Sequence, residues 1–320
     1  MIEIKDLNPY VKDRWGLYGG LSGAKYGILM DGSRWMVKFP ENTKNFPGKE
    51  KPGHHIPSYT SSPVSEYIGS KIYESLEIPV HEVILGYRDG KIVAACKDFD
   101  PYHAMADYGK IKNAVTENDA NLTGSSSRHG EVLDDVLTVI DTSDILRDTP
   151  NVRERFWDMF VTDAFIRNND RNNGNWGVFI NGDGTAALAP VYDNGNALFN
   201  KRNPSVAEKR LCNEADIIQD AIETGTSFFM DINGRHIHPF SFIENMKNED
   251  CNAAVLRFAG KIDLDKVRKI VDDIPCAAYG IEIITDAQKA HYKRMFEIIC
   301  EKSIFPTAEK IQNINCRCRS

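Results

Sequence analysis

The sequence lacks any apolar run near the length of a membrane span, and it does not begin with an apolar leader. A helix that crosses a bilayer needs about 20 consecutive apolar residues, whereas the first residues, MIEIKDLNPYVKD, carry charges throughout. Secretory signal peptides instead join a basic start to an apolar segment. We therefore expect a cytoplasmic protein with no membrane partner, although secretion without a signal peptide would leave no such pattern.

Cysteines are few and show no disulfide or zinc pattern. The chain has seven, an odd number, and none forms a C-x-x-C pair, which is the spacing typical of structural zinc sites. Only Cys316 and Cys318 lie close together, and two thiols supply half of a tetrahedral site. We expect reduced thiols and no structural metal.

An excess of basic charge is also missing. The formal net charge is -7 and the acidic residues are spread along the chain, so no direct nucleic-acid partner is predicted. With 42% hydrophobic and 27% charged residues, the composition is that of a globular protein rather than a disordered or coiled-coil one. A length of 320 residues is enough for two lobes with a core each.

The first hundred residues carry mostly strand signals. Two dipeptides, Asp31-Gly32 and Asp89-Gly90, each join two apolar segments, which is typical of two-residue hairpins. One helix is expected within this region. Ser62 can act as its N-cap, Pro63 fits the first turn, and apolar residues recur at intervals of four before Pro79.

Helical signals dominate the later part of the chain. Three segments are the clearest. The first follows Pro150, the second covers 264–274, and the third begins after Thr285, where Gln288 completes a T-x-x-Q capping box. Between the first two segments, apolar runs at 176–180 and 187–192 flank a turn and predict a second hairpin.

The strongest functional signal combines a D-x-x-x-x-N loop with a D-x-G turn. Asp170 precedes Asn175 by five residues, and Asp193 follows 18 residues later, with Gly195 expected to let the chain turn sharply. Phosphoryl transfer needs a carboxylate that accepts the proton of the attacking hydroxyl, and oxygen ligands for Mg²⁺. Asn, Asp and Gly also gather in turns for local reasons. That explanation suits the neighbouring residues better than it suits Asp170, Asn175 and Asp193 as a set.

A glycine-rich segment, GGLSGAK, precedes a strand that contains a lysine. Backbone N–H groups at Gly20, Ser22 and Gly23 could approach phosphate oxygens, and Lys38 in WMVKFP could reach them as a point charge. No GK[ST] opens a helix here, so the segment is not a Walker A motif. Glu66 on the next predicted helix would complete the lysine–glutamate ion pair of kinases.

The order of these motifs predicts a phosphotransferase of α+β class with a two-lobed protein-kinase-like fold. The first lobe, residues 1–99, would be a small antiparallel sheet with one helix and would bind the nucleotide. The second lobe, residues 100–320, would be mainly helical and catalytic.

The sequence resembles the HipA-like serine/threonine kinase family, and within it the CtkA-type bacterial kinases. The similarity covers about residues 15–200 and is carried by MVKFP, SEYIGSKI, VAACKDF, FWDMFVTDAF, NNDRNNGNWG and APVYDNGNAL. It implies ATP and Mg²⁺ as cofactors. It also implies a catalytic base at Asp170, Mg²⁺ ligands at Asn175 and Asp193, a phosphate-binding lysine at Lys38 and an orienting carboxylate at Glu66.

The resemblance also places a nucleotide-binding hinge and marks one departure from the family. Lys97, Asp98 and Phe99 fall where the hinge strand would contact adenine through its backbone. The family's loop often has histidine two residues after the catalytic aspartate, but this chain has Asn172. Asparagine donates a hydrogen bond and cannot become cationic, so a slower enzyme, or another group in that role, is expected.

The predicted activity is transfer of the γ-phosphoryl group of ATP to a protein hydroxyl, with autophosphorylation at Ser22 first and at the serines of TGSSSR next. The protein substrate has no sequence signature. An antitoxin-type partner is implied by the family resemblance alone. The main alternative is a small-molecule or phosphoinositide-type kinase. A nucleotide-binding pseudokinase or interaction module is disfavoured because Lys38, Asp170, Asn175 and Asp193 are all present.

Overall fold

The structure, a computed structural model, describes residues 1–13, 24–44, 57–100, 104–116 and 130–317. The chain forms two compact units, and each unit combines segments that are distant in sequence. The first comprises Met1–Pro101, Asp193–Ala221 and Asp263–Glu297, and the second Tyr102–Tyr192, Ile222–Ile262 and Ile298–Ser320. The predicted lobes are contiguous in sequence whereas these units interleave, so the lobe boundary at residue 99 stays a prediction.

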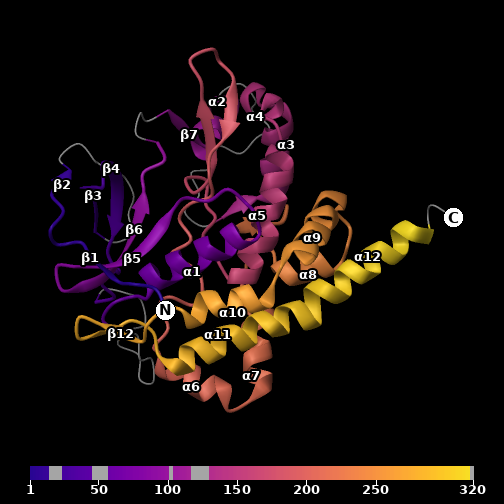
Figure 1. Cartoon of the computed structure of the whole chain (residues 1–320). Coiled ribbons are helices and arrows are strands. Elements are labelled where there is room, and N and C mark those ends of the chain that lie inside the picture. Colours follow the sequence, from indigo (N-terminus) through magenta and orange to yellow (C-terminus); the bar gives the residue numbers. More distant parts are fainter. Residues whose placement is uncertain (14–23, 45–56, 101–103, 117–129, 318–320) are drawn as a thin grey trace. The chain divides into compact units, whose positions relative to one another are not determined.

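The first unit contains a six-stranded sheet in the order β1-β5-β6-β4-β3-β2 (Figure 1). Neighbouring strands are antiparallel except β1 and β5, which run parallel. That pair departs from the antiparallel sheet expected from the sequence. The strands are β1 (Lys5–Asp6), β2 (Lys12–Asp13), β3 (Lys25–Met30), β4 (Ser33–Lys38), β5 (Val83–Arg88) and β6 (Lys91–Lys97).

Both predicted hairpins of this sheet are confirmed. The turn between β3 and β4 has φ of 52° at Asp31 and 76° at Gly32, and the turn between β5 and β6 has 49° at Asp89 and 75° at Gly90. Two successive positive φ values match the right-handed twist of the strands, and Asp-Gly is favoured there because these residues tolerate them.

The two faces of the sheet have different roles. One face carries an apolar core of Leu7, Ile28, Met30, Trp35, Val37, Val93 and Ala95. Side chains alternate between faces along a strand, and Lys38 pairs with Ala94, two residues before Cys96. Lys38 and Cys96 therefore lie on the other face. There, helix α1 (Ser62–Ser75) packs against β5 and β6 (Figure 1).

Helix α1 begins one residue earlier than expected. Ser61 occupies the N-cap position without a side-chain cap, so the predicted cap at Ser62 is wrong, and Ser62 starts the helix. The amide of Ser61 donates to the carbonyl of Asn200 at 2.8 Å, so a tertiary contact fixes the chain there. Pro63 lies in the first turn as predicted.

The rest of the first unit is helical apart from a small hairpin. The capping box at the start of α11 is confirmed, because the Gln288 amide donates to Thr285 Oγ1 at 3.1 Å and the Thr285 amide donates to Gln288 Oε1 at 3.0 Å. The elements are α6 (Ser205–Leu211), α7 (Glu214–Ile218), α10 (Leu264–Asp272), β12 (Ala277–Ala278) and β13 (Ile281–Glu282), together with most of a π-helical turn (Gln219–Glu223) and of α11 (Asp286–Ile299), whose last two residues in each case are assigned to the second unit.

The second unit is built around helix α5 (Val152–Ile166), the helix predicted after Pro150. Most of α5 is buried, and it contacts α3, α8 and α9. The predicted hairpin is present as β9 and β10. The remaining elements are β7 (Met105–Asp107), α2 (Tyr108–Thr116), β8 (Glu131–Val132), α3 (Leu133–Thr142), α4 (Asp144–Asp148), β9 (Gly177–Ile180), β10 (Ala186–Leu188), β11 (Phe229–Met230), α8 (Pro239–Glu244), α9 (Glu249–Lys261), a π-helical turn (Cys300–Ile304) and α12 (Phe305–Arg317). Within the described segments, every helix is too short or too polar to traverse a lipid bilayer.

Candidate active site

Lys38 is held between two carboxylates in the first unit. It ends strand β4, and its Nζ donates to Glu66 Oε2 and to Asp193 Oδ1, each at 2.9 Å. Glu66 comes from α1, and Asp193 begins the next segment of the same unit. The structure therefore joins three residues that the sequence singled out, although they are up to 155 positions apart.

The second oxygen of Glu66 is also occupied. Glu66 Oε1 lies 2.9 Å from His81 Nε2 and accepts the backbone N–H of Asn194 at 3.1 Å. His81 Nε2 also lies 3.1 Å from Ser70 Oγ, which accepts from Asn194 Nδ2 at 3.0 Å. Because a carboxylate only accepts hydrogen bonds, we assign a proton to His81 Nε2. Glu66 is thus fixed from two sides.

These contacts shift the ionisation of the buried groups. Burial alone would raise the pKa of the Glu66 carboxyl, but the Lys38 ammonium and the hydrogen bond from His81 hold that pKa well below its usual range. Burial would lower the pKa of Lys38, but Asp193 and Glu66 raise it well above its ordinary value. Both groups are therefore ionised at neutral pH, as a phosphate-binding lysine requires.

In the D-x-G turn, the backbone departs from ordinary φ values at the aspartate and not, as expected, at the glycine. Asp193 has a left-handed φ of 60°, whereas Gly195 is not among the residues with positive φ. Glycine is favoured at 195 for a steric reason instead, because a Cβ atom there would lie 3.0 Å from Glu66 Oε2. A strained conformation at a non-glycine residue is common at functional sites, and here it falls on the proposed metal ligand.

The second unit contains the D-x-x-x-x-N loop, and a buried ion pair holds it in place. Arg171 donates from Nε and Nη2 to Asp163 of α5 at 2.8 and 2.9 Å. Its Nη1 donates to the backbone carbonyls of Asn175 at 3.0 Å and Tyr192 at 2.5 Å. A planar guanidinium makes such paired contacts that a lysine cannot. Arg171 thereby ties both arms of the hairpin to α5.

Asp170 itself is oriented by two asparagines. Asn172 Nδ2 donates to Asp170 Oδ1 at 3.0 Å, and Asn175 Nδ2 donates to the Asp170 carbonyl at 2.7 Å. Asn172, where the family resemblance led us to expect histidine, supplies a neutral hydrogen bond to the carboxylate.

A buried pair supports the middle of this loop. Asn173 Nδ2 donates to Glu131 Oε2 at 2.6 Å, and Glu131 Oε1 accepts from Lys112 Nζ. Lys112 and Glu131 are each about 1% exposed. The start of α2 also binds the loop, because the amide of Gly109 donates to the carbonyl of Asn173 at 2.9 Å. These contacts leave the loop little freedom.

The predicted nucleotide-loop residues Gly20, Ser22 and Gly23 lie outside the described residues. At the predicted hinge, the amide of Lys97 donates to Glu82 O at 2.8 Å and that of Asp98 to Arg34 O at 2.9 Å. The backbone N–H groups of Lys97 and Asp98 are thus already bonded within the protein, and contact of Lys97, Asp98 and Phe99 with adenine stays a prediction.

Sequence reasoning missed the residues that position the predicted ones. They are Lys25, Ser70, His81, Lys112, Glu131, Asp163, Arg171 and Asn194. Lys25 had a detectable signal, because it ends GGLSGAK and its strand pairs with that of Lys38, which lies directly opposite. Burial lowers the pKa of the Lys25 amino group. The others bind partners on other elements, from eight residues away for Asp163 and Arg171 to 128 for Glu66 and Asn194, and no local pattern shows such contacts.

The chain belongs to the HipA-like C-terminal domain family, whose model matches residues 19–278. The family resemblance of the sequence is thereby confirmed. The chain is 34% identical over 262 residues to the serine/threonine-protein kinase CtkA of Helicobacter pylori strain J99, with 81% of this chain and 75% of that protein covered. It is therefore a homologue of a serine/threonine protein kinase.

Solved structures agree with this assignment. The crystal structure of the H. pylori proinflammatory kinase CtkA has a TM-score of 0.82 at 27% identity, covering 97% of this chain and 99% of that one. HipA of Shewanella oneidensis MR-1, solved with HipB and operator DNA, has a TM-score of 0.52 at 13% identity and covers 93% and 68%. The second likeness shows the fold alone. The mixed α/β fold is thus that of CtkA and HipA.

Proposed function

We propose that this chain is an ATP- and Mg²⁺-dependent protein serine/threonine kinase that transfers the γ-phosphoryl group to a protein hydroxyl. The observation that carries the proposal is the Lys38 ammonium, which is held 2.9 Å from both Glu66 and Asp193. Surface lysines seldom have two fixed carboxylate partners, because such pairs contribute little in water. A partly buried cation fixed in this way, with 17% of its side chain exposed, is suited to receive phosphate oxygens.

The residues divide the chemistry among themselves. Lys38, oriented by Glu66, binds phosphate oxygens of ATP. Asp170 accepts the proton of the attacking serine or threonine hydroxyl as the oxygen forms its bond to phosphorus and the bond to ADP breaks. Asn172 keeps the Asp170 carboxylate oriented through its 3.0 Å hydrogen bond. The glycine-rich segment with Gly20, Ser22 and Gly23 would cover the phosphates.

The chemistry of Asn175 and Asp193 fits Mg²⁺. The Asn175 amide nitrogen is used by Asp170, and no hydrogen bond from a described residue reaches its oxygen. Asp193 uses one oxygen for Lys38, and its other oxygen likewise accepts no hydrogen bond from the described part of the chain. Amide and carboxylate oxygens are the ligands that Mg²⁺ prefers. When bound, the ion would neutralise charge on the phosphates.

The CtkA homology favours a protein substrate over a small molecule or a phosphoinositide. An antitoxin-type partner stays an expectation from the wider family, since the toxin–antitoxin relative shares only the fold. The intact set of Lys38, Asp170, Asn175 and Asp193 argues against a pseudokinase.

The test is phosphotransfer from labelled ATP and Mg²⁺ by the purified chain, with and without a mixed protein extract. Label should appear on protein, and Asp170→Ala should lower the rate by about 10²–10⁴ while nucleotide binding changes only a few-fold. Label on small molecules or lipid alone would instead establish the alternative kinase class. An undiminished rate in Asp170→Ala would remove that residue from the role of base.

A further inference from the structure

Three metal-ligand side chains converge behind Lys38, in the first unit. The ligand atoms of Glu66, His81 and Cys96 all lie within 4.8 Å of one another. They come from α1, from the segment that precedes β5, and from β6. Each side chain is at least 95% buried. No part of the proposed phosphoryl transfer uses His81 or Cys96 as a reacting group.

We propose that Glu66, His81 and Cys96 form a binding site for a borderline-soft divalent cation of the zinc class, and that its occupation inhibits the enzyme. Thiolate, imidazole and carboxylate are the three ligand types that proteins use for Zn²⁺. Metal–ligand bonds of about 2.0–2.3 Å place tetrahedral ligands about 3.3–3.8 Å apart. The carboxylate and imidazole atoms, now 2.9 Å apart, must therefore separate slightly, and any pair near the 4.8 Å limit must close by about 1 Å. A hard ion such as Mg²⁺ does not select a thiol or an imidazole.

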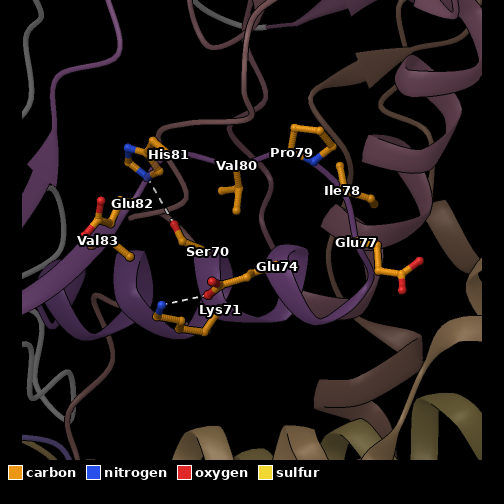
Figure 2. A pocket seen from close by; sticks show the side chains of 10 residues that line it. All are labelled: Ser70, Lys71, Glu74, Glu77, Ile78, Pro79, Val80, His81, Glu82 and Val83. Atoms are coloured by element: carbon orange, nitrogen blue, oxygen red, sulfur yellow. Dashed lines mark hydrogen bonds and ion pairs between the residues drawn. The ribbon is translucent and has the colours of Figure 1, made fainter.

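A cavity beside the cluster gives the cation a route. The cavity measures about 450 Å³ and is lined by α1 and by the segment leading into β5, including Ser70 and His81. Figure 2 shows these two side chains linked by their hydrogen bond, with Glu74, Glu77 and Glu82 also around the cavity. Three carboxylates against one lysine, Lys71, leave the lining with net negative charge, which raises the local concentration of cations.

Binding changes the protons and the charge of the cluster in a defined way. The metal replaces the proton at His81 Nε2, so the bound imidazole carries its proton on Nδ1, and the Cys96 thiol releases its proton to solvent. Thiolate and carboxylate together balance the two positive charges. Glu66 Oε1 then serves the metal, which withdraws negative charge from the ion pair with Lys38.

Inhibition follows from the weakened ion pair between Glu66 and Lys38. The inhibition rests on the proposed kinase function, whereas the metal binding itself does not rest on it. A Glu66 carboxylate shared with a dication attracts Lys38 less strongly, so Lys38 is less well oriented for ATP. We expect Zn²⁺ to raise the KM for ATP in the presence of excess Mg²⁺.

The binding test uses Co²⁺, whose bond to a thiolate gives a charge-transfer band in the ultraviolet. The protein carries Cys316→Ser and Cys318→Ser to remove the C-x-C of the tail, and it is kept reduced by a non-thiol reductant. The band should appear in this background and be displaced by Zn²⁺. Cys96→Ser should abolish it and weaken metal binding by at least about 10–100-fold, the usual cost of disturbing a metal site.

Cys276→Ser is the matched control, because its thiol lies 3.1 Å from Asp286 and so also pairs sulfur with carboxylate. It should leave the band and the zinc affinity unchanged. His81→Gln provides a second variant in case Cys96→Ser fails to fold, and it should also lose the band. A parent without the band, or a band that survives Cys96→Ser or His81→Gln, overturns the site. Zinc binding that leaves the KM for ATP unchanged in an active enzyme overturns the inhibition.

Discussion

Replacement of Glu66 by glutamine changes the site by one charge and almost no volume. The carboxylate serves Lys38, His81 and the Asn194 amide. Glutamine keeps one acceptor oxygen, which can satisfy His81 and Asn194. Its other terminal atom becomes an NH₂ donor, which then faces the Lys38 ammonium, itself a donor. The variant therefore loses the contact to Lys38 and keeps the rest.

The expected cost is about 2–3 kcal/mol in the free energy of unfolding. Removal of one partner of a buried ion pair typically costs about 3–5 kcal/mol, and a hydrogen bond to a charged group is worth about 1.5–3 kcal/mol. Lys38 keeps its 2.9 Å contact to Asp193 in the variant, so its charge stays partly compensated. This places the estimate at or below the bottom of the first range and within the second.

Urea unfolding measures this cost, and Glu74→Gln is the matched control on the same helix. Glu74 pairs with Lys71 at 2.7 Å, but its side chain is 61% exposed. Exposed pairs are worth about 0–1 kcal/mol, so the control should unfold close to the parent. If Glu66→Gln is no more destabilised than Glu74→Gln, the buried pair does not stabilise the fold.

The pH dependence gives a second readout with a defined sign. Folding lowers the pKa of Glu66, so its charge contributes stability that is fully present above the unfolded pKa of about 4.3. That contribution is lost as the pH falls through the folded pKa. The gap between parent and Glu66→Gln should be constant from about pH 8 to about pH 6 and should shrink in acid. A gap that grows in acid would refute the assignment.

Three further predictions concern the metal, the loop and self-modification. Asp193→Ala should weaken nucleotide binding more strongly when Mg²⁺ is present than when it is absent, because the ion bridges the phosphates; equal ATP affinity of the parent with and without Mg²⁺ would contradict this. Glu131→Gln should lower kcat more than it raises the KM for ATP, since Glu131 supports Asn173 in the loop of Asp170; an effect on KM alone would refute it. Mass spectrometry after incubation with Mg²⁺-ATP should find phosphate on Ser22 in the parent and none when Asp170 is alanine. Such a phosphate adds about -1.5 to -2 charge to the glycine-rich segment. Phosphate in both proteins would exclude autophosphorylation.

Local signals predicted much of the first unit correctly because each has a short-range cause. The two Asp-Gly turns need positive φ, and their positions are confirmed. The capping box of Thr285 and Gln288 depends on residues three positions apart and is also confirmed. The N-cap of α1 was placed one residue late because a contact from Asn200, far along the chain, fixes the backbone at Ser61.

The sequence predicted the candidate catalytic and binding residues of the site, but not the residues that position them. Lys38 and Glu66 follow the order of strand lysine and helix glutamate found in kinases, and the structure joins them. His81 gave no signal, because a lone histidine in the segment between α1 and β5 has no spacing that distinguishes it from any other histidine. The pair of Lys112 and Glu131 was hidden for a related reason. Charged residues are almost always exposed, so complete burial is visible only in the folded chain.

The space around Gly195 links two motifs that are usually treated separately. A methyl group at this position would meet the Glu66 carboxylate at 3.0 Å, so the glycine of the D-x-G turn and the glutamate of α1 constrain each other. A homologous chain that loses the carboxylate is thereby released from the need for glycine, and one that gains a side chain at 195 has to shift the carboxylate oxygen that contacts Lys38. Paired loss at the two positions would therefore mark members of the family that have abandoned phosphoryl transfer.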